Sequence, residues 1–113
     1  MIKVVILNKL RDEIYKTFKK DSLKVYSLME ELQTHPQKGK VLGHVGSISI
    51  RELKYGSYRL YCVLDGHRLF LFTRDQTVEL LIRFVAMSKK HNQQQTIDEI
   101  KRILTVIGPA GFE

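Results

Sequence analysis

The chain has 113 residues with only one cysteine, no tryptophan and two prolines. The residue types and sequence patterns that it lacks exclude several classes of protein. Cys62 alone forms neither a disulfide framework nor a cysteine-based zinc site. No apolar run approaches the ~20 residues that span a membrane, and the apolar run within residues 1–8 is interrupted too soon for a signal peptide. We therefore expect a cytoplasmic protein. The length predicts a single domain over residues 1–113, because domains typically have ~100–150 residues.

Positive charge is concentrated in one segment of the chain. The formal net charge is +7, and residues 35–91 hold ten Lys and Arg against four Asp and Glu. An excess of this kind favours a surface that binds a polyanion such as a nucleic acid, where phosphate contacts supply much of the affinity. The alternative is an ordinary basic surface whose lysines are solvated.

The N-terminal third predicts a strand followed by two helices. Residues 1–7 contain a β-branched apolar run, which is typical of a strand buried on both faces. Residues 8–34 predict a helical hairpin, with Asn8 as the cap of its first helix. The apolar positions at helical spacing are Leu10, Ile14, Phe18, Val25, Leu28, Met29 and Leu32. Residues 36–46 are rich in turn-forming residues, and no regular element is expected there.

Residues 47–88 predict a meander of four strands, because the hydrophobic period changes to two. The strands are expected at residues 48–53, 58–64, 67–73 and 77–88. The first strand changes phase near Arg51 and Glu52, as a bulge would cause. The Asp65-Gly66 pair predicts a tight hairpin. One face of the last strand is expected to carry Leu80, Ile82, Phe84 and Ala86.

A third helix is predicted at residues 96–107. Thr96 and Glu99 match a capping box, and the Gly108-Pro109 pair ends the helix. Its apolar stripe, which is either core or a patch left for a partner, consists of Ile97, Ile100, Ile103, Leu104 and Ile107. The element order indicates an α+β fold in which an N-terminal strand and a helical hairpin pack on a small sheet, with a helix at the C-terminus.

Three segments resemble the RelE/ParE toxin superfamily, in particular the RelE- and HigB-like toxins of type II toxin–antitoxin systems. Residues 28–39 match its segment of helix, polar turn, proline and glycine. Residues 50–61 match its basic strand, turn and Tyr-Arg-hydrophobic-Tyr sequence, and residues 84–90 match its last strand with a basic end. The resemblance covers roughly residues 2–104. It implies a RelE-like fold with a twisted, mostly antiparallel sheet.

The resemblance implies a toxin that cleaves mRNA, usually on the ribosome, without a metal or any other cofactor. In this reaction the ribose 2′-hydroxyl attacks the adjacent phosphate and leaves a cyclic phosphate and a 5′-hydroxyl. The resemblance also implies a cognate acidic antitoxin as protein partner. Two alternatives stay open: a ParE-like toxin that inhibits DNA gyrase without cutting RNA, and a RelE-fold binding protein without catalytic activity.

The resemblance places Arg59 on the family's phosphate-stabilising arginine, since a guanidinium is planar, permanently charged and bidentate toward phosphate. The alternative for Arg59 is a structural salt bridge to Glu52. Lys54 is expected near Arg59, as a phosphate contact or as an ordinary strand charge. Glu52 falls where the best-known ribosome-dependent member carries a lysine, and it is either a general base or the partner of Arg59.

Lys90 and His91 complete the implied catalytic set. Lys90 matches the basic residue after the family's last strand, and His91 has an unperturbed pKa near ~6.5 that suits a proton donor. The alternative is a flexible charged loop. The aromatic residue found further along in cleaving members has no counterpart in residues 92–96. Further phosphate contacts are expected from Arg51, Arg83, Lys89, Lys38 and Lys40. Arg83 has the alternative of pairing with Glu79, and no metal site is expected.

Overall fold

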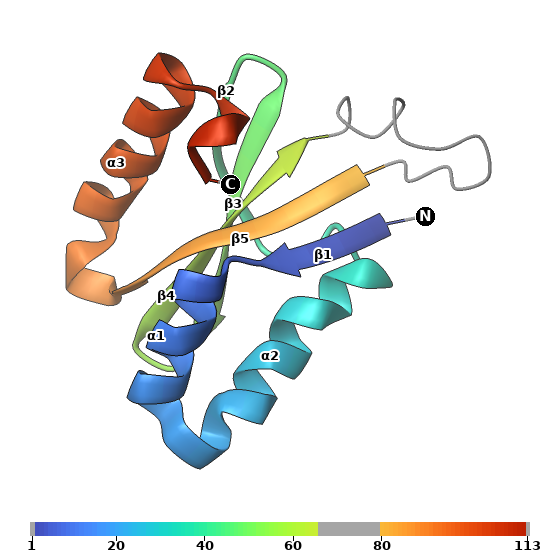
Figure 1. Ribbon diagram of the computed structural model, residues 1–113, viewed down its shortest axis with the longest axis vertical. Coiled ribbons are helices and arrows are strands. Elements are labelled where there is room, and N and C mark those ends of the chain that lie inside the picture. Colours follow the sequence, from blue (N-terminus) through green and yellow to red (C-terminus); the bar gives the residue numbers. More distant parts are fainter. Residues whose placement is uncertain (1, 66–79, 113) are drawn as a thin grey trace.

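The computed structural model describes residues 2–65 and 80–112, and these residues form an α+β fold around one five-stranded sheet (Figure 1). The strand order is β1-β5-β4-β3-β2, with β1 parallel to β5 and the other pairs antiparallel. The strands are β1 (Ile2–Ile6), β2 (Lys40–Val45), β3 (Ile48–Tyr55), β4 (Tyr58–Asp65) and β5 (Leu80–Lys89). The α+β class expected from the sequence is confirmed. The expected strand at 67–73 and the Asp65-Gly66 turn fall outside the described residues.

The described residues form three α-helices beside the sheet: α1 (Asn8–Phe18), α2 (Ser22–Glu30) and α3 (Gln93–Val106). Short 3-10 turns follow α1 and α2, precede α3 and end the described chain. They span Lys19–Asp21, Glu31–Gln33, Lys90–Asn92 and Pro109–Phe112. Within the two described ranges, no helix is long and apolar enough to cross a membrane.

The sheet has helices on both faces, with α1 and α2 on one side and α3 on the other (Figure 1). The side chains of β4 alternate between the two faces of the sheet, as the alternating sequence of this strand predicts. Leu60 and Cys62 join the core under α1 and α2, whereas Tyr61 and Val63 join the core under α3. We call these surfaces the α1–α2 face and the α3 face. The apolar stripe of α3 is therefore core along Ile97, Ile100 and Leu104.

Strand β2 is an element that the sequence did not predict, because residues 36–46 read as turns. Its pairing with β3 shifts register between Val41 and Gly43, so its apolar residues do not alternate regularly. The expected phase change at Arg51 and Glu52 is wrong, since β3 pairs with β4 in one continuous register. The irregularity lies in the edge strand β2. This strand has only one neighbouring strand, so its bulge disturbs no second ladder of hydrogen bonds.

The expected common face of the last strand is also wrong at Ala86. Strand β5 places Phe84 opposite Cys62 but Ala86 opposite Tyr61, so Val85 is an extra residue without a partner on β4. The bulge moves Ala86 onto the α3 face, whereas Ile82 and Phe84 face α1 and α2.

Neither predicted helix cap is formed. The residue before α1 is Leu7, and no side chain caps that end, so Asn8 is inside the helix. Helix α3 begins at Gln93, three residues before the predicted capping box, because glutamines extend a helix readily. Thr96 therefore lies within the helix and donates its hydroxyl to the carbonyl oxygen of Asn92 at 3.2 Å. The predicted stop holds: Gly108 has φ +87° and donates its amide to Ile103 O at 3.1 Å.

Replacing Gly39 by alanine is expected to destabilise the fold by about 2–3 kcal/mol. Gly39 has φ +94°, and a Cβ atom there would meet the carbonyl oxygen of Glu52 at 2.7 Å and Leu53 Cδ2 at 3.2 Å. Gly46→Ala is the matched control: its φ is +60°, but a Cβ atom there has no neighbour within 4 Å. Urea unfolding measures both variants, and equal losses of stability would contradict the steric explanation.

Candidate anion-binding site beside the β3–β4 turn

The turn between β3 and β4 brings two cations together. Gly56 has φ +58° and occupies the first position of a two-residue hairpin turn, where glycine is favoured. The hairpin pairs Tyr55 with Tyr58, so Lys54 lies directly opposite Arg59 on the α3 face. Like charges directly opposite each other destabilise a sheet. The register therefore places two like charges at one cross-strand position, which favours the approach of an anion.

Arg59 is buried, with 7% of its surface exposed. Its Nη1 atom donates to the carbonyl oxygens of Gly56 at 3.2 Å and Tyr58 at 3.0 Å, so the side chain turns back toward the hairpin. Its Nε atom is buried without a hydrogen-bond partner. The salt bridge to Glu52 considered from the sequence is not formed among the described residues. The guanidinium thus keeps both its charge and donor capacity.

Glu52 is 2% exposed and lies on the same face, two residues before Lys54. Its Oε2 atom accepts a hydrogen bond from Nε2 of Gln93 at 2.6 Å. Gln93 is the first residue of α3, so this bond connects the start of that helix to the sheet. The carboxylate is held by a neutral donor rather than by Arg59.

Tyr61 and Ser88 complete the polar group beneath α3. Tyr61 lies opposite Glu52 and is fully buried, and its hydroxyl is 2.8 Å from Ser88 Oγ. Burial raises the pKa of the Tyr61 hydroxyl above its usual value. The hydrogen bond between Tyr61 and Ser88 opposes the rise, the charge of Glu52 adds to it and the charge of Arg59 opposes it. Ser88 in turn lies opposite Arg59. Sequence reasoning missed Ser88 and Gln93, since only the strand register and the helix position bring them here.

Lys90 and Lys40 lie on either side of this group. The backbone amide of Lys90 donates to the carbonyl oxygen of Ser57 at 2.9 Å, which holds Lys90 beside the β3–β4 turn. Lys40 is exposed on β2, directly opposite Glu52. His91 is exposed and lines an open hollow of about 440 Å³ between α1 and the start of α3. Lys54 also borders a second hollow beside α2.

Two of the predicted arginines lie elsewhere. Arg51 is opposite Cys62 on the α1–α2 face, and its Nη1 atom donates to the carbonyl oxygen of Pro36 at 2.7 Å. Arg83 is on the α3 face but opposite Val63, four residues or about 13 Å along β4 from Arg59. It donates to Pro109 O at 3.5 Å. Its suggested partner Glu79 falls outside the described residues.

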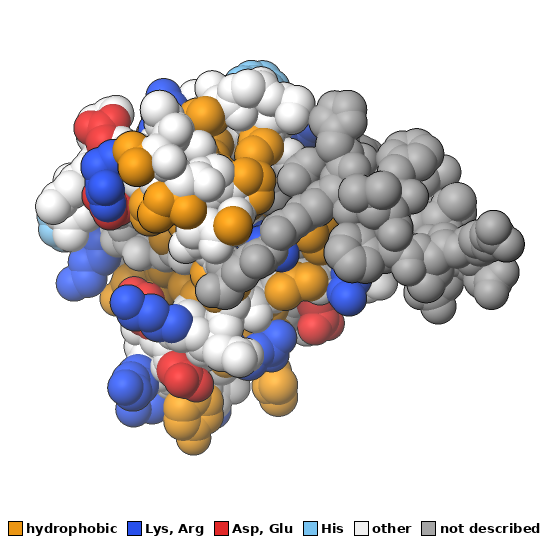
Figure 2. Space-filling view, turned by 45° about the horizontal axis from the view of Figure 1, so that its top comes forward, with side chains coloured by type: hydrophobic (Ala, Val, Ile, Leu, Met, Phe, Trp, Pro, Cys, Tyr) orange, Lys and Arg blue, Asp and Glu red, His pale blue; other side chains and the backbone are white. Residues whose placement is uncertain are grey.

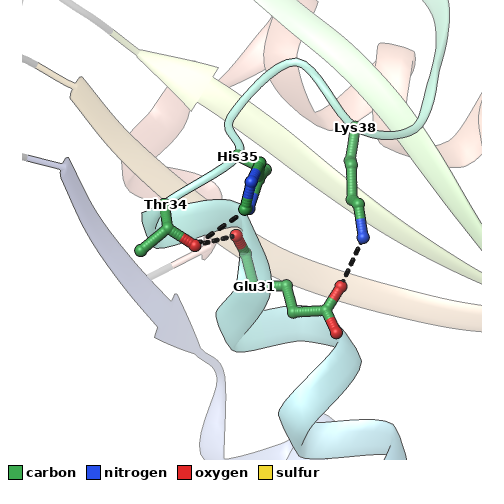
Figure 3. Close-up of polar contacts among 4 residues, drawn as sticks. All are labelled: Glu31, Thr34, His35 and Lys38. Carbon is green, nitrogen blue, oxygen red and sulfur yellow. Dashed lines mark hydrogen bonds and ion pairs between the residues drawn. The ribbon is translucent and has the colours of Figure 1, made fainter.

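Two of the predicted lysines are also separate from the group. Lys38 forms an ion pair with Glu31, with 2.6 Å between Nζ and Oε2, and this pair lowers the pKa of Glu31 (Figure 3). Lys89 lies opposite Tyr58, whose ring packs on Phe18, and is therefore on the α1–α2 face. The structure brings together Arg59, Lys54, Glu52, Lys40 and Lys90, and leaves the other predicted phosphate contacts apart.

Cys62 is expected to be inert toward thiol reagents in the native protein. It is fully buried, and burial raises its pKa to about 12, although Arg51 acts in the opposite direction. A raised pKa keeps the thiol neutral at pH 8, with only about one native molecule in ten thousand carrying the reactive thiolate. Mass spectrometry after iodoacetamide treatment should show modification in urea and almost none in buffer. Rapid modification of the native protein would contradict this burial.

The charges of the site differ from those of the helical surface. Figure 2 shows Lys and Arg side chains interspersed with Asp and Glu over the lower, helical part of the molecule.

Within residues 2–65 and 80–112, no three His, Cys, Asp or Glu side chains are grouped to hold a metal ion. No family model, curated protein or solved structure matches the chain. The arrangement itself, a buried guanidinium beside lysines, is suited to binding a phosphate group.

Proposed function

We propose that this protein is a RelE-like toxin that cleaves mRNA as a metal-independent endoribonuclease. The main support is Arg59, a buried guanidinium that lies opposite Lys54 and forms no ion pair among the described residues. A cation placed in this way stabilises the charge that develops on a phosphate during cleavage. The element order, with a helical hairpin on a mostly antiparallel sheet, is compatible with the RelE-like fold that the sequence motifs imply.

In the proposed reaction the ribose 2′-oxygen forms a bond to the adjacent phosphorus, and the bond from phosphorus to the 5′-oxygen breaks. Arg59 and Lys54 bind the phosphoryl oxygens and stabilise the pentacoordinate state. Glu52 accepts the proton of the 2′-hydroxyl on the carboxylate oxygen that Gln93 does not bind. His91 donates a proton to the leaving 5′-oxygen, and Lys40 and Lys90 contact the flanking phosphates.

The proposed toxin has a substrate and a protein partner. The substrate is mRNA, presented by the ribosome, and an acidic antitoxin neutralises the toxin by covering its basic residues. The reaction uses no cofactor, because each proton transfer and each charge has a side chain of this protein assigned to it. The expected surroundings are therefore those of the cytoplasm, where ribosomes and a cognate antitoxin are both present.

Primer extension on cellular mRNA after induction of the protein tests the proposal. The expected result is a set of new 5′ ends inside coding regions, each carrying a 5′-hydroxyl, together with arrested translation. Intact mRNA accompanied by DNA breaks would instead assign the protein to gyrase inhibition. Normal growth without an antitoxin, with mRNA and DNA both intact, would assign it to binding without catalysis.

A further inference from the structure

The first turn of α3, residues 93–96, follows the end of β5 and lies on the carboxylate of Glu52 (Figure 1). Gln93 donates to Glu52 Oε2 at 2.6 Å, and only 2% of the Glu52 surface is exposed. In the proposed reaction Glu52 meets a ribose hydroxyl, and a carboxylate buried to this degree is closed to a substrate of that size. This requirement rests on the proposed function, whereas the contacts of α3 do not. A movement that releases Gln93 from Glu52 would satisfy it.

Few contacts hold the first turn of α3 in place. The core under α3 begins at Ile97, and the side chains of residues 93–96 are half-buried or exposed. Among the described residues, the bond from Gln93 is the side-chain hydrogen bond that joins this turn to the sheet, since Gln94 and Thr96 bond along their own segment. No side chain caps this end of the helix. A turn without a cap or core contacts opens at low cost in free energy.

The sequence of α3 contains a second helix start, three residues further on. In a capping box formed by Thr96 and Glu99, the hydroxyl accepts the amide of Glu99 and the carboxylate accepts the amide of Thr96. In the structure the Thr96 hydroxyl instead donates to Asn92 O at 3.2 Å. The Glu99 carboxylate pairs with Arg102, with 2.7 Å between Oε1 and Nη2. Both contacts are exposed, and an exposed ion pair on a helix adds little stability, so neither prevents the capping box from forming.

We propose that α3 switches between two starts and so covers and uncovers Glu52. In the long form the helix begins at Gln93, which holds the carboxylate, and the helix start has no side-chain cap. In the short form it begins at Ile97 with Thr96 as its cap, and Gln93 leaves Glu52. Ile97 stays in the core in both forms, and the open hollow of about 440 Å³ beside residues 92–95 has room for the unwound turn. A ligand that binds the uncovered carboxylate side of the sheet shifts the balance to the short form.

Amide hydrogen exchange of the whole protein, followed by NMR, distinguishes the two forms. In the long form the amides of Ile97 and Asp98 bond to carbonyl oxygens four residues earlier, whereas in the short form they lie at the new helix start without intrahelical partners. The amide of Glu99 is bonded in both forms, to the helix in one and to Thr96 Oγ in the other. Exchange at Ile97 and Asp98 should therefore be about tenfold or more faster than at Glu99. Rates that change gradually along the helix, with no step between Asp98 and Glu99, would overturn the second start.

Gln93→Ala and Gln95→Ala form the matched pair of variants. Both replace a glutamine of the first turn by a better helix former, but only Gln93→Ala removes the bond to Glu52. Gln93→Ala should speed exchange at the amides of residues 97 and 98 about tenfold, and Gln95→Ala should leave it unchanged or slower. Thr96→Ala removes the cap of the short form and should slow the same exchange about fivefold. Circular dichroism verifies folding, and equal rates in the two glutamine variants, or no slowing in Thr96→Ala, would overturn the proposal.

Labelling with a carbodiimide and a glycine ester measures whether the short form uncovers Glu52. In the unaltered protein, Glu52 should react far more slowly than Glu30, which is exposed on α2. Labelling of Glu52 should be about tenfold faster in Gln93→Ala than in Gln95→Ala, in proportion to the population of the short form. Equal labelling in the two variants would overturn the proposal.

Neither measurement uses RNA, so the switch and the proposed function fail separately. A protein that cleaves mRNA but shows unchanged exchange and labelling in Gln93→Ala has no such switch. A protein that shows both changes but leaves mRNA intact keeps the switch and contradicts the proposed function alone.

Discussion

Replacing Arg59 by alanine is expected to lower mRNA cleavage by about 100-fold to 1000-fold. The guanidinium is the buried cation nearest to the proposed reaction, and its loss leaves the developing phosphoryl charge to Lys54 alone. Arg59→Lys should recover part of the rate, since it restores charge but not the planar pair of donors. The rate of appearance of new 5′ ends by primer extension measures both variants.

Arg51→Ala is the matched control for this prediction. Arg51 resembles Arg59 in having a buried Nε atom without a partner, but it lies on the opposite face and donates to Pro36 O. We expect Arg51→Ala to destabilise the fold by about 1–3 kcal/mol while cleavage per folded molecule is kept. Cleavage retained in Arg59→Ala, or lost equally in both variants at equal folded fraction, would contradict the assigned role of Arg59.

The largest expected loss of stability comes from Phe84→Ala, at about 3–5 kcal/mol. Phe84 is fully buried on β5, in the core that β1, β4 and the helices α1 and α2 share. Its removal leaves a cavity in the middle of the sheet, and the loss is large beside the ~5–15 kcal/mol that stabilise a typical domain. Urea unfolding followed by circular dichroism measures the change.

Val106→Ala provides the comparison for Phe84→Ala. Val106 is 70% exposed at the end of α3, so its truncation should change the free energy of unfolding by no more than about 0.5 kcal/mol. A loss below about 1 kcal/mol in Phe84→Ala would show that the sheet closes over the space without cost.

The helical hairpin could be predicted from the sequence because its apolar residues repeat at helical spacing. Leu10, Ile14, Val25 and Met29 are all buried in one core, as the period requires. The hairpin register that places Lys54 opposite Arg59 could also be predicted from the sequence, since a two-residue turn containing glycine fixes the pairing of the strands.

The position of Arg51 shows where the sequence was insufficient. Side chains alternate along a strand, so Arg51 and Lys54 belong to opposite faces unless a bulge lies between them. The irregular spacing of Ile48, Ile50 and Leu53 suggested such a bulge, but β3 is regular and all three are buried because both faces are covered. A strand buried on both sides loses the alternation that would reveal its register.

Contacts between residues far apart in the sequence could not be predicted either. The bond between Glu52 and Gln93 joins residues 41 apart in the sequence, and it depends on where α3 begins. The capping box predicted a start at residue 96, which would have left Gln93 in the preceding loop. The polar group beneath α3 is therefore a property of the packed molecule rather than of any one motif.

The pairing of β1 with β5 has a consequence for synthesis of the protein on the ribosome. Residue Ile2 pairs with Leu80, so the first strand to emerge waits for the last strand before it finds its partner. Helices α1 and α2 meanwhile lack β5, which carries Ile82 and Phe84 into their core. Gln93, which holds Glu52, emerges later still. The nascent chain thus acquires its complete candidate site only after Gln93 has left the ribosome.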